Sequence, residues 1–230
     1  SGQGKAEIVD ADSDSKTEVT VKDGDDVEIK FSPDPGYTLG SVTVNGESKT
    51  GEVKENSLKL TGIEKDTAVV VTFQSIDFTV AAPASKVYTG AAQEPQLTVN
   101  SGGTALESKD YTVSYAIVDG TGAALVNNKP LTAGTYTVTV TGKEGSAYEG
   151  KTATTTFVIT PKRLTADMMK DINSQSYTGG AITPDVEITC NGKTLVKDTD
   201  YTVSYSKNVG PGTATVTITG IGNYTGVITK

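Results

Sequence analysis

The sequence predicts an all-β fold in which small β-sandwich modules follow one another along the chain. Its composition favours strands and turns, because helix-forming runs are lacking, threonine is abundant and 25 of the 230 residues are glycine. Apolar and polar residues alternate over many short segments, which is typical of strands with one buried and one exposed face. The hexapeptide DYTVSY occurs twice, at 110–115 and 200–205, and indicates a repeated structural unit.

The repeat extends well beyond this hexapeptide. YTGAAQEP (88–95) matches YTGGAITP (177–184), and GTYTVTVTG (134–142) matches GTATVTITG (212–220). The matching segments keep their order, which indicates a duplicated module. The copies differ mainly at Ala116–Ala133, where the first copy has 18 residues and the second has 6. Because insertions are tolerated in loops, this segment is predicted to be an enlarged connection.

The alternation within each copy predicts which side chains face the core. In DYTVSY the tyrosines and the valine share one face, and threonine and serine share the other. We interpret the tyrosines as core anchors, since a buried tyrosine supplies apolar area while its hydroxyl reaches a backbone partner. Each copy is expected to form an immunoglobulin-like β-sandwich of about 70 to 85 residues. The predicted inward residues are Tyr111, Val113, Tyr115, Tyr136, Val138 and Val140, and in the second copy Tyr201, Tyr205, Ala214, Val216 and Ile218.

Residues 1–76 differ from the two copies and predict an acidic all-β module of another type. Four strands are expected, and a Pro-Gly turn and an Asn-Gly turn separate the first strands. The predicted inward residues along these strands are Val27, Ile29 and Phe31, then Val42 and Val44, then Leu58 and Leu60, and finally Val69, Val71 and Phe73.

Three tandem domains are expected, namely residues 1–76, residues 77–160 and residues 161–230. The segments that join them, 74–77 and 160–162, are short, which restricts bending and favours an elongated array. In the second domain the strand TATTTFVIT follows the last YxG motif, whereas only four residues follow it in the third. We therefore expect the third domain to lack most of its last strand, to expose an unpaired edge, and to belong to a longer chain.

Two stretches resemble known families. FSPDPGYTLGSVTVNG with LTGIEKDTAVVVTF is similar to the divergent repeat modules of bacterial surface proteins, related in pattern to internalin-type B repeats. YTGGAITPDVEI with LVKDTDYTVSYSKNVGPGTATVTITGIGNYTG resembles the bacterial immunoglobulin-like repeats of large cell-wall and secreted proteins, especially of Gram-positive gut bacteria. The resemblance covers nearly the whole chain. It implies an extracellular stalk, spacer or adhesive region, with no catalytic residues and no named ligand.

The residue types present exclude several functions. The chain has no histidine and one cysteine, so Ser-His-Asp sites, Cys-His sites, histidine-based zinc sites and internal disulfides are excluded. We expect no enzyme, no catalytic residue and no cofactor. The net charge is −8, of which residues 1–76 carry −7, and no basic face for nucleic acid is visible. No apolar run reaches the roughly 20 residues of a membrane span, so no membrane insertion is expected.

The acidic run DADSDSK (10–16), with Asp23–Asp26 nearby, resembles the start of a calcium-binding loop. In that pattern a glycine is required at the position of Ser15, and a bidentate glutamate at the position of Val21. Because both are missing, we interpret the run as solvated acidic surface and expect no metal site.

Cys190 shares a predicted strand face with Ile188 and precedes an Asn-Gly turn. The alternatives are a reactive or intermolecular thiol and a small half-buried side chain. The chain has no histidine to activate the thiol, so we favour the second.

Sugar-binding surfaces usually need exposed aromatic residues, and the chain has no tryptophan. The tyrosines of the repeated YxG motifs, Tyr88, Tyr148, Tyr177 and Tyr224, are the exceptions to core placement, and we interpret them as structural corners. The enlarged loop Ala116–Ala133 is the better candidate for a binding role, because function gathers on loops held by a rigid scaffold.

The favoured hypothesis is a monomeric, non-catalytic stalk of a bacterial cell-surface or secreted protein. One alternative is a binding module for a glycan or a host surface protein, with binding residues that the sequence does not identify. Another is an accessory region of a carbohydrate-active enzyme. An internal amide crosslink between lysine and asparagine also stays open, although no set of residues in the sequence identifies one.

Overall fold

A computed structural model describes residues 3–9, 19–118 and 122–230. Apart from two short 3-10 turns, η1 (Thr50–Glu52) and η2 (Ala166–Met168), the regular structure of these residues consists of β-strands, paired mostly antiparallel. The predicted all-β fold is therefore confirmed. Within the described ranges, no helix has the length and apolar character needed to cross a membrane.

Contacts along the chain divide it into two compact units. The first unit consists of Ser1–Val80, Thr98–Val113 and Val140–Ala153, and the second of Ala81–Leu97, Ser114–Thr139 and Thr154–Lys230. The domain boundaries expected after residues 76 and 160 stay predictions.

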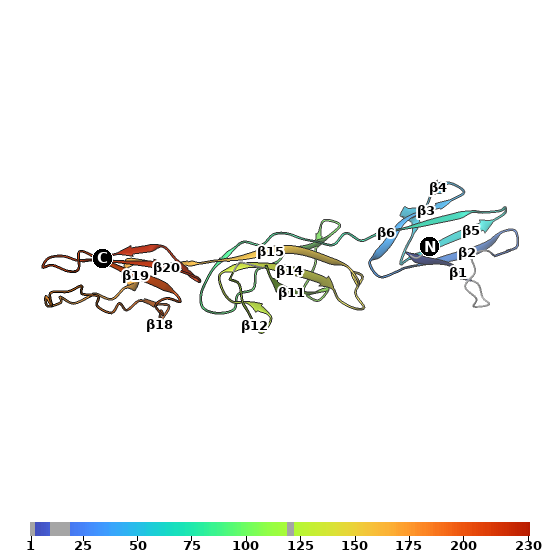
Figure 1. The fold of residues 1–230 in the computed structure, drawn as a ribbon. Helices are drawn as coiled ribbons and strands as arrows, with labels where there is room; N and C mark the ends of the chain where they lie inside the picture. The colour runs from blue at the N-terminus through green and yellow to red at the C-terminus, as the bar shows by residue number, and fades with distance from the viewer. Residues whose placement is uncertain (1–2, 10–18, 119–121) are drawn as a thin grey trace. The chain divides into compact units, whose positions relative to one another are not determined.

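Two three-stranded antiparallel sheets form a β-sandwich in the first unit (Figure 1). Their strand orders are β1-β2-β5 and β4-β3-β6. The core between them contains Val27, Ile29, Phe31, Val42 and Leu58, each at most 8% exposed, as the alternation predicted. The bounds are β1 Gly4–Val9, β2 Asp25–Pro33, β3 Tyr37–Val44, β4 Glu47–Ser48, β5 Ser57–Ile63 and β6 Val69–Ser75.

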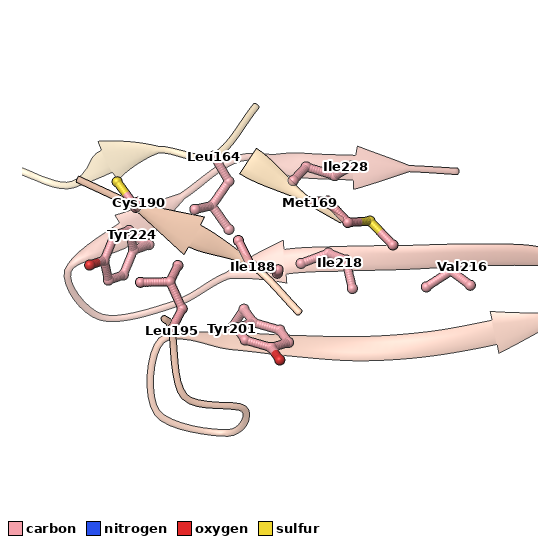
Figure 2. Close-up of a cluster of buried hydrophobic side chains, with 10 residues drawn as sticks. All are labelled: Leu164, Met169, Ile188, Cys190, Leu195, Tyr201, Val216, Ile218, Tyr224 and Ile228. Carbon is pink, nitrogen blue, oxygen red and sulfur yellow. The ribbon is translucent and has the colours of Figure 1, made fainter. Parts of the chain in front are cut away.

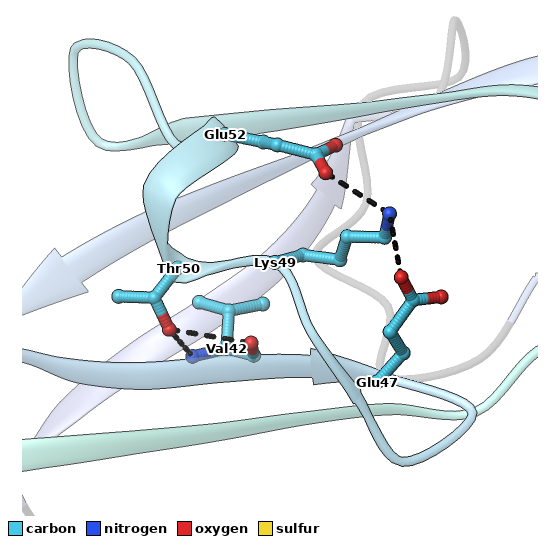
Figure 3. A network of polar contacts seen from close by, with 5 residues as sticks. All are labelled: Val42, Glu47, Lys49, Thr50 and Glu52. Atoms are coloured by element: carbon cyan, nitrogen blue, oxygen red, sulfur yellow. Dashed lines mark hydrogen bonds and ion pairs between the residues drawn. The ribbon is translucent and has the colours of Figure 1, made fainter.

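Beside β4, which is only two residues long, Thr50 forms side-chain hydrogen bonds with the backbone of β3. The Thr50 hydroxyl accepts a hydrogen bond from the Val42 N–H at 2.9 Å and donates one to the Val42 carbonyl at 3.3 Å (Figure 3). Nearby, Lys49 forms ion pairs with Glu52 at 2.9 Å and with Glu47 at 3.5 Å. Both carboxylates are largely exposed, so these pairs add little stability compared with the backbone bonds of Thr50.

The first unit also contains a small antiparallel sheet of order β10-β9-β7, with β7 Thr79–Val80, β9 Val99–Ser101 and β10 Thr104–Ala105. In the same unit, Lys151 donates to the Ser75 hydroxyl at 2.7 Å and lies 4.9 Å from the centre of the Tyr37 ring. The Gly36 N–H donates to the Ala147 carbonyl at 3.1 Å. These contacts join the sandwich to the segment Val140–Ala153.

Tyr136, Val138, Phe157 and Ile159 form a buried cluster in the second unit, and each is at most 1% exposed. The strands around it form a four-stranded sheet of order β11-β14-β15-β8, and the end of β15 runs parallel to β8. The bounds are β8 Lys86–Val87, β11 Tyr111–Ile117, β12 Leu125–Val126, β13 Lys129–Pro130, β14 Gly134–Gly142 and β15 Thr152–Thr160.

A second buried cluster lies among the C-terminal strands (Figure 2). It contains Leu164, Met169, Ile188, Cys190, Leu195, Tyr201, Val216, Ile218, Tyr224 and Ile228. The sheets around it have the orders β19-β20-β22, β17-β18 and β16-β21. The bounds are β16 Lys162–Arg163, β17 Thr189–Cys190, β18 Lys193–Thr194, β19 Tyr201–Ser206, β20 Thr215–Gly220, β21 Tyr224–Thr225 and β22 Val227–Thr229.

The same backbone contacts recur at the matching positions of the sequence. The Leu106 N–H donates to the Val99 carbonyl at 2.8 Å, and the Leu195 N–H donates to the Ile188 carbonyl at 2.9 Å. Asp110 and Asp200, the first residues of the two DYTVSY segments, both accept a backbone bond at 3.0 Å through their carbonyl groups. Matching positions of the two copies thus form the same backbone hydrogen bonds at these two points.

Two residues that were predicted to point inward are exposed. Ala214 precedes β20, which begins at Thr215, so it lies before the buried alternation starts. Val113 is 36% exposed, although its counterpart Val203 packs against the C-terminal cluster. Met168 and Ile172 pack there too, whereas the sequence has threonine and proline 89 residues earlier. Less apolar surface is therefore present to cover Val113.

Candidate functional site

The enlarged loop Ala116–Ala133 is built into the fold rather than projecting freely from it. Its described part contains the hairpin of β12 and β13, and Asn127 and Asn128 at the tip have φ of 48° and 59°. Asparagine suits such a turn because it tolerates the left-handed conformation. Ala123 and Leu125 pack against the buried cluster of Tyr136. The sequence predicted an enlarged connection here, but it did not predict that part of this segment packs against the core.

The hydroxyl of Tyr136 forms hydrogen bonds with the backbone of this loop. It contacts the Thr132 carbonyl at 2.7 Å and the Ala124 carbonyl at 2.9 Å, and it accepts from the Ala124 N–H at 3.3 Å. The ring is fully buried. Tyr136 thus combines core packing with the backbone bonding that the sequence led us to expect of the tyrosines.

Among the described residues of the loop, those at the hairpin tip are exposed. Val126 is 38% exposed, and Lys129 forms an exposed ion pair with Glu94 at 2.7 Å. This tip is the place on the loop where a binding partner could make contact without disturbing the core.

The four YxG tyrosines have different surroundings. The rings of Tyr88 and Tyr224 meet edge-on with centroids 5.6 Å apart, and Tyr148 lies 5.9 Å from Phe78. Tyr177 is 62% exposed. Burial is the main cause that raises the pKa of Tyr224 from 10.0 to about 12, followed by the interaction with Tyr88. Burial likewise raises the pKa of Tyr115 to about 12. Both phenols are neutral side chains at ordinary pH.

Cys190 is 4% exposed and belongs to the C-terminal cluster, so it is more buried than the predicted half-buried side chain. It borders a small cavity of about 180 Å³ that Tyr88, Tyr224, Lys162 and Lys193 also line. Burial limits access to the thiol, which agrees with a structural side chain.

The predicted acidic surface is described only in part. Asp10, Asp12 and Asp14 lie outside the described residues, whereas Asp23–Asp26 are exposed. The pKa of Asp26 is lowered, first by its hydrogen bond with Lys59 and then by the Gly62 N–H. In the described ranges, no group of three or more Cys, Asp or Glu side chains is placed to hold a metal ion.

A larger cavity of about 720 Å³ lies in the first unit, and the sequence did not predict it. Its wall includes Ile8, Val27 and Val69, which belong to strands of both sheets of the sandwich. The alternation predicts which face of a strand is apolar, but it does not predict how completely two apolar faces close on each other. No local signal in the sequence could therefore have revealed this cavity.

Comparison with models of known protein families gives no match, and comparison with curated proteins gives no similar sequence.

Proposed function

We propose that the chain is a non-catalytic structural segment, a stalk or spacer, of a bacterial protein at the cell surface or outside the cell. The observation that carries the proposal is the position of Tyr88, which packs against both buried clusters of the second unit and meets Tyr224 edge-on. A motif repeated in the sequence is thus used to join one part of the unit to another. Such contacts suit a segment that must keep its structure under tension.

Backbone and side-chain hydrogen bonds reinforce the same connection. Asn223 accepts from the Ala133 N–H through its side chain at 2.8 Å and from the Lys162 N–H through its carbonyl at 2.9 Å. The strands β16 and β21 run parallel beside it. The exposed faces of the strands carry many threonines, which stay hydrated while favouring extended backbone.

A single-molecule force measurement tests this role. The chain is held at its two ends and stretched repeatedly, first as the natural sequence and then with Tyr88→Ala. A spacer predicts discrete unfolding steps that recover on relaxation, and a lower unfolding force for the variant. Gradual extension without steps would overturn the proposal, because such a chain could not hold a fixed length.

A binding role is the competing function, and the exposed hairpin tip of the enlarged loop is the feature that favours it. Screening the chain against glycans, mucins and host surface proteins tests it, beside Val126→Asp as the tip variant and Val227→Asp, at a more exposed position outside the loop, as the control. Specific binding that only the tip variant loses would replace the spacer role with an adhesive one. Removing the whole loop would be uninformative, because Ala123 and Leu125 belong to the core.

A further inference from the structure

The cavity of about 720 Å³ in the first unit has the size of a small-molecule site. Its inner wall is aliphatic and consists of Ala6, Ile8, Val27, Ile29, Leu60 and Val71, among others. Ile29 and Val27 are 4% and 8% exposed and lie deepest, while Ile8 and Leu60 are only partly buried. The two sheets thus leave apolar surface between them that the described residues do not cover completely.

The mouth of the cavity is acidic. Asp23, Glu64 and Asp66 line it together with one lysine, Lys65, so the charged groups sum to −2. All four side chains are exposed, and in the part of the chain that the structure describes none of them forms a hydrogen bond or an ion pair through its charged group. Three unpaired carboxylates above an aliphatic space create a negative potential at its entrance.

The segment 10–18, which the structure does not describe, has a composition that does not match this space. Its sequence, DADSDSKTE, contains one apolar residue, Ala11, and four acidic ones. Burying a carboxylate against an aliphatic wall without a partner is costly. An occupant that covers this wall must therefore bring apolar atoms of its own.

We propose that this cavity binds a small organic cation with an aliphatic body, an alkylammonium compound. The alkyl chain would cover Ile8, Val27 and Leu60, and the ammonium group would lie among Asp23, Glu64 and Asp66 at the mouth. Burial of the methylene groups gives the affinity, and the carboxylates at the mouth favour a positively charged head group. This inference goes beyond the spacer role and does not depend on it.

Three ligands of equal chain length test the proposal, namely n-octylammonium, octanoate and 1-octanol. Each is titrated into the whole chain, and binding is followed by ¹H–¹⁵N NMR shifts and by the melting temperature. Octylammonium is expected to shift the amides of Ile8, Val27 and Leu60 and to raise the melting temperature. Octanoate is expected to bind at least about tenfold more weakly, because the exposed carboxylates repel it.

Two variants at the cavity and one control pair elsewhere test where the ligand binds. Glu64→Gln with Asp66→Asn should weaken octylammonium binding about two- to threefold and leave octanol binding unchanged, since each exposed charge contributes little. Glu55→Gln with Glu144→Gln removes the same charge from exposed positions elsewhere and should leave binding unchanged. Ala6→Leu should reduce the binding of octylammonium and of octanol, because the larger side chain fills part of the cavity.

Equal binding of octylammonium and octanoate would overturn the proposal. So would the absence of any saturable NMR shift, or an effect of the control pair as large as that of Glu64→Gln with Asp66→Asn. If Ala6→Leu lowers stability too far to be measured, the charge variants alone decide, because their side chains are exposed and lie outside the core.

Discussion

The ring of Tyr88 meets the ring of Tyr224 edge-on, with centroids 5.6 Å apart and ring planes inclined by 85°. This geometry places the positive edge of one ring against the negative face of the other. Tyr88 also packs against both buried clusters of the second unit, while Tyr177, at the matching position 89 residues later, is 62% exposed. One repeated motif thus supplies a packed tyrosine and an exposed one.

Replacing these two tyrosines is expected to have very different effects. Tyr88→Ala should lower the free energy of unfolding by about 2–4 kcal/mol, because it removes a ring that contacts both clusters. Tyr177→Ala should change it by less than about 0.5 kcal/mol, as is usual for an exposed position. Urea unfolding followed by circular dichroism measures both. Equal effects would contradict the structural role assigned to Tyr88.

The hydroxyl of Tyr136 is expected to stabilise the enlarged loop. Tyr136→Phe keeps the buried ring but leaves the carbonyls of Ala124 and Thr132 without this partner, which should cost about 1–3 kcal/mol. Tyr111→Phe is the matched control from the same copy, because Tyr111 makes no side-chain hydrogen bond within the described residues, and it should cost less than about 0.5 kcal/mol. Thermal unfolding of the two variants makes the comparison, and a smaller loss for Tyr136→Phe would refute it.

The glycine that ends β14 is expected to be essential for a close backbone approach. A Cβ atom at Gly142 would collide with the Tyr148 carbonyl oxygen, and one at Gly220 would lie 2.7 Å from the Thr225 nitrogen. Gly142→Ala should therefore cost more than about 2 kcal/mol, since the backbone must move to admit the methyl group. Gly180→Ala, where the added atom meets open space, serves as the control in the same denaturation measurement.

Alkaline pH is expected to destabilise the protein partly through Tyr224, whose pKa is raised from 10.0 to about 12 because the ring is buried. The folded state holds the neutral phenol more strongly than the unfolded state does. The resulting stabilisation is complete below about pH 10 and is lost as the pH rises towards 12. Tyr224→Phe should make the free energy of unfolding fall less steeply between these values. An unchanged slope in denaturation experiments at several pH values would be incompatible with this assignment.

The sequence predicted the parts of the fold that depend on local patterns. Strict alternation identified Tyr136, Val138 and Ile218 as core residues, and the duplicated segments indicated where the same pairing would recur. It failed at Ala214 and Val113, because a strand boundary and the apolar covering from a distant segment decide their exposure. The hydroxyl contacts of Tyr136 and the cavity of the first unit depend on how distant segments meet, so no local pattern reveals them.

The central claim is that Tyr88 and Tyr224 have a structural role and join parts of the second unit. A double-mutant cycle tests it most directly, with Tyr88→Ala, Tyr224→Ala and both changes together, each followed by urea unfolding. The account predicts a coupling free energy of about 0.5–1.5 kcal/mol between Tyr88 and Tyr224, and none between Tyr177 and Tyr224. Additive effects of Tyr88→Ala and Tyr224→Ala, within about 0.3 kcal/mol, would contradict it.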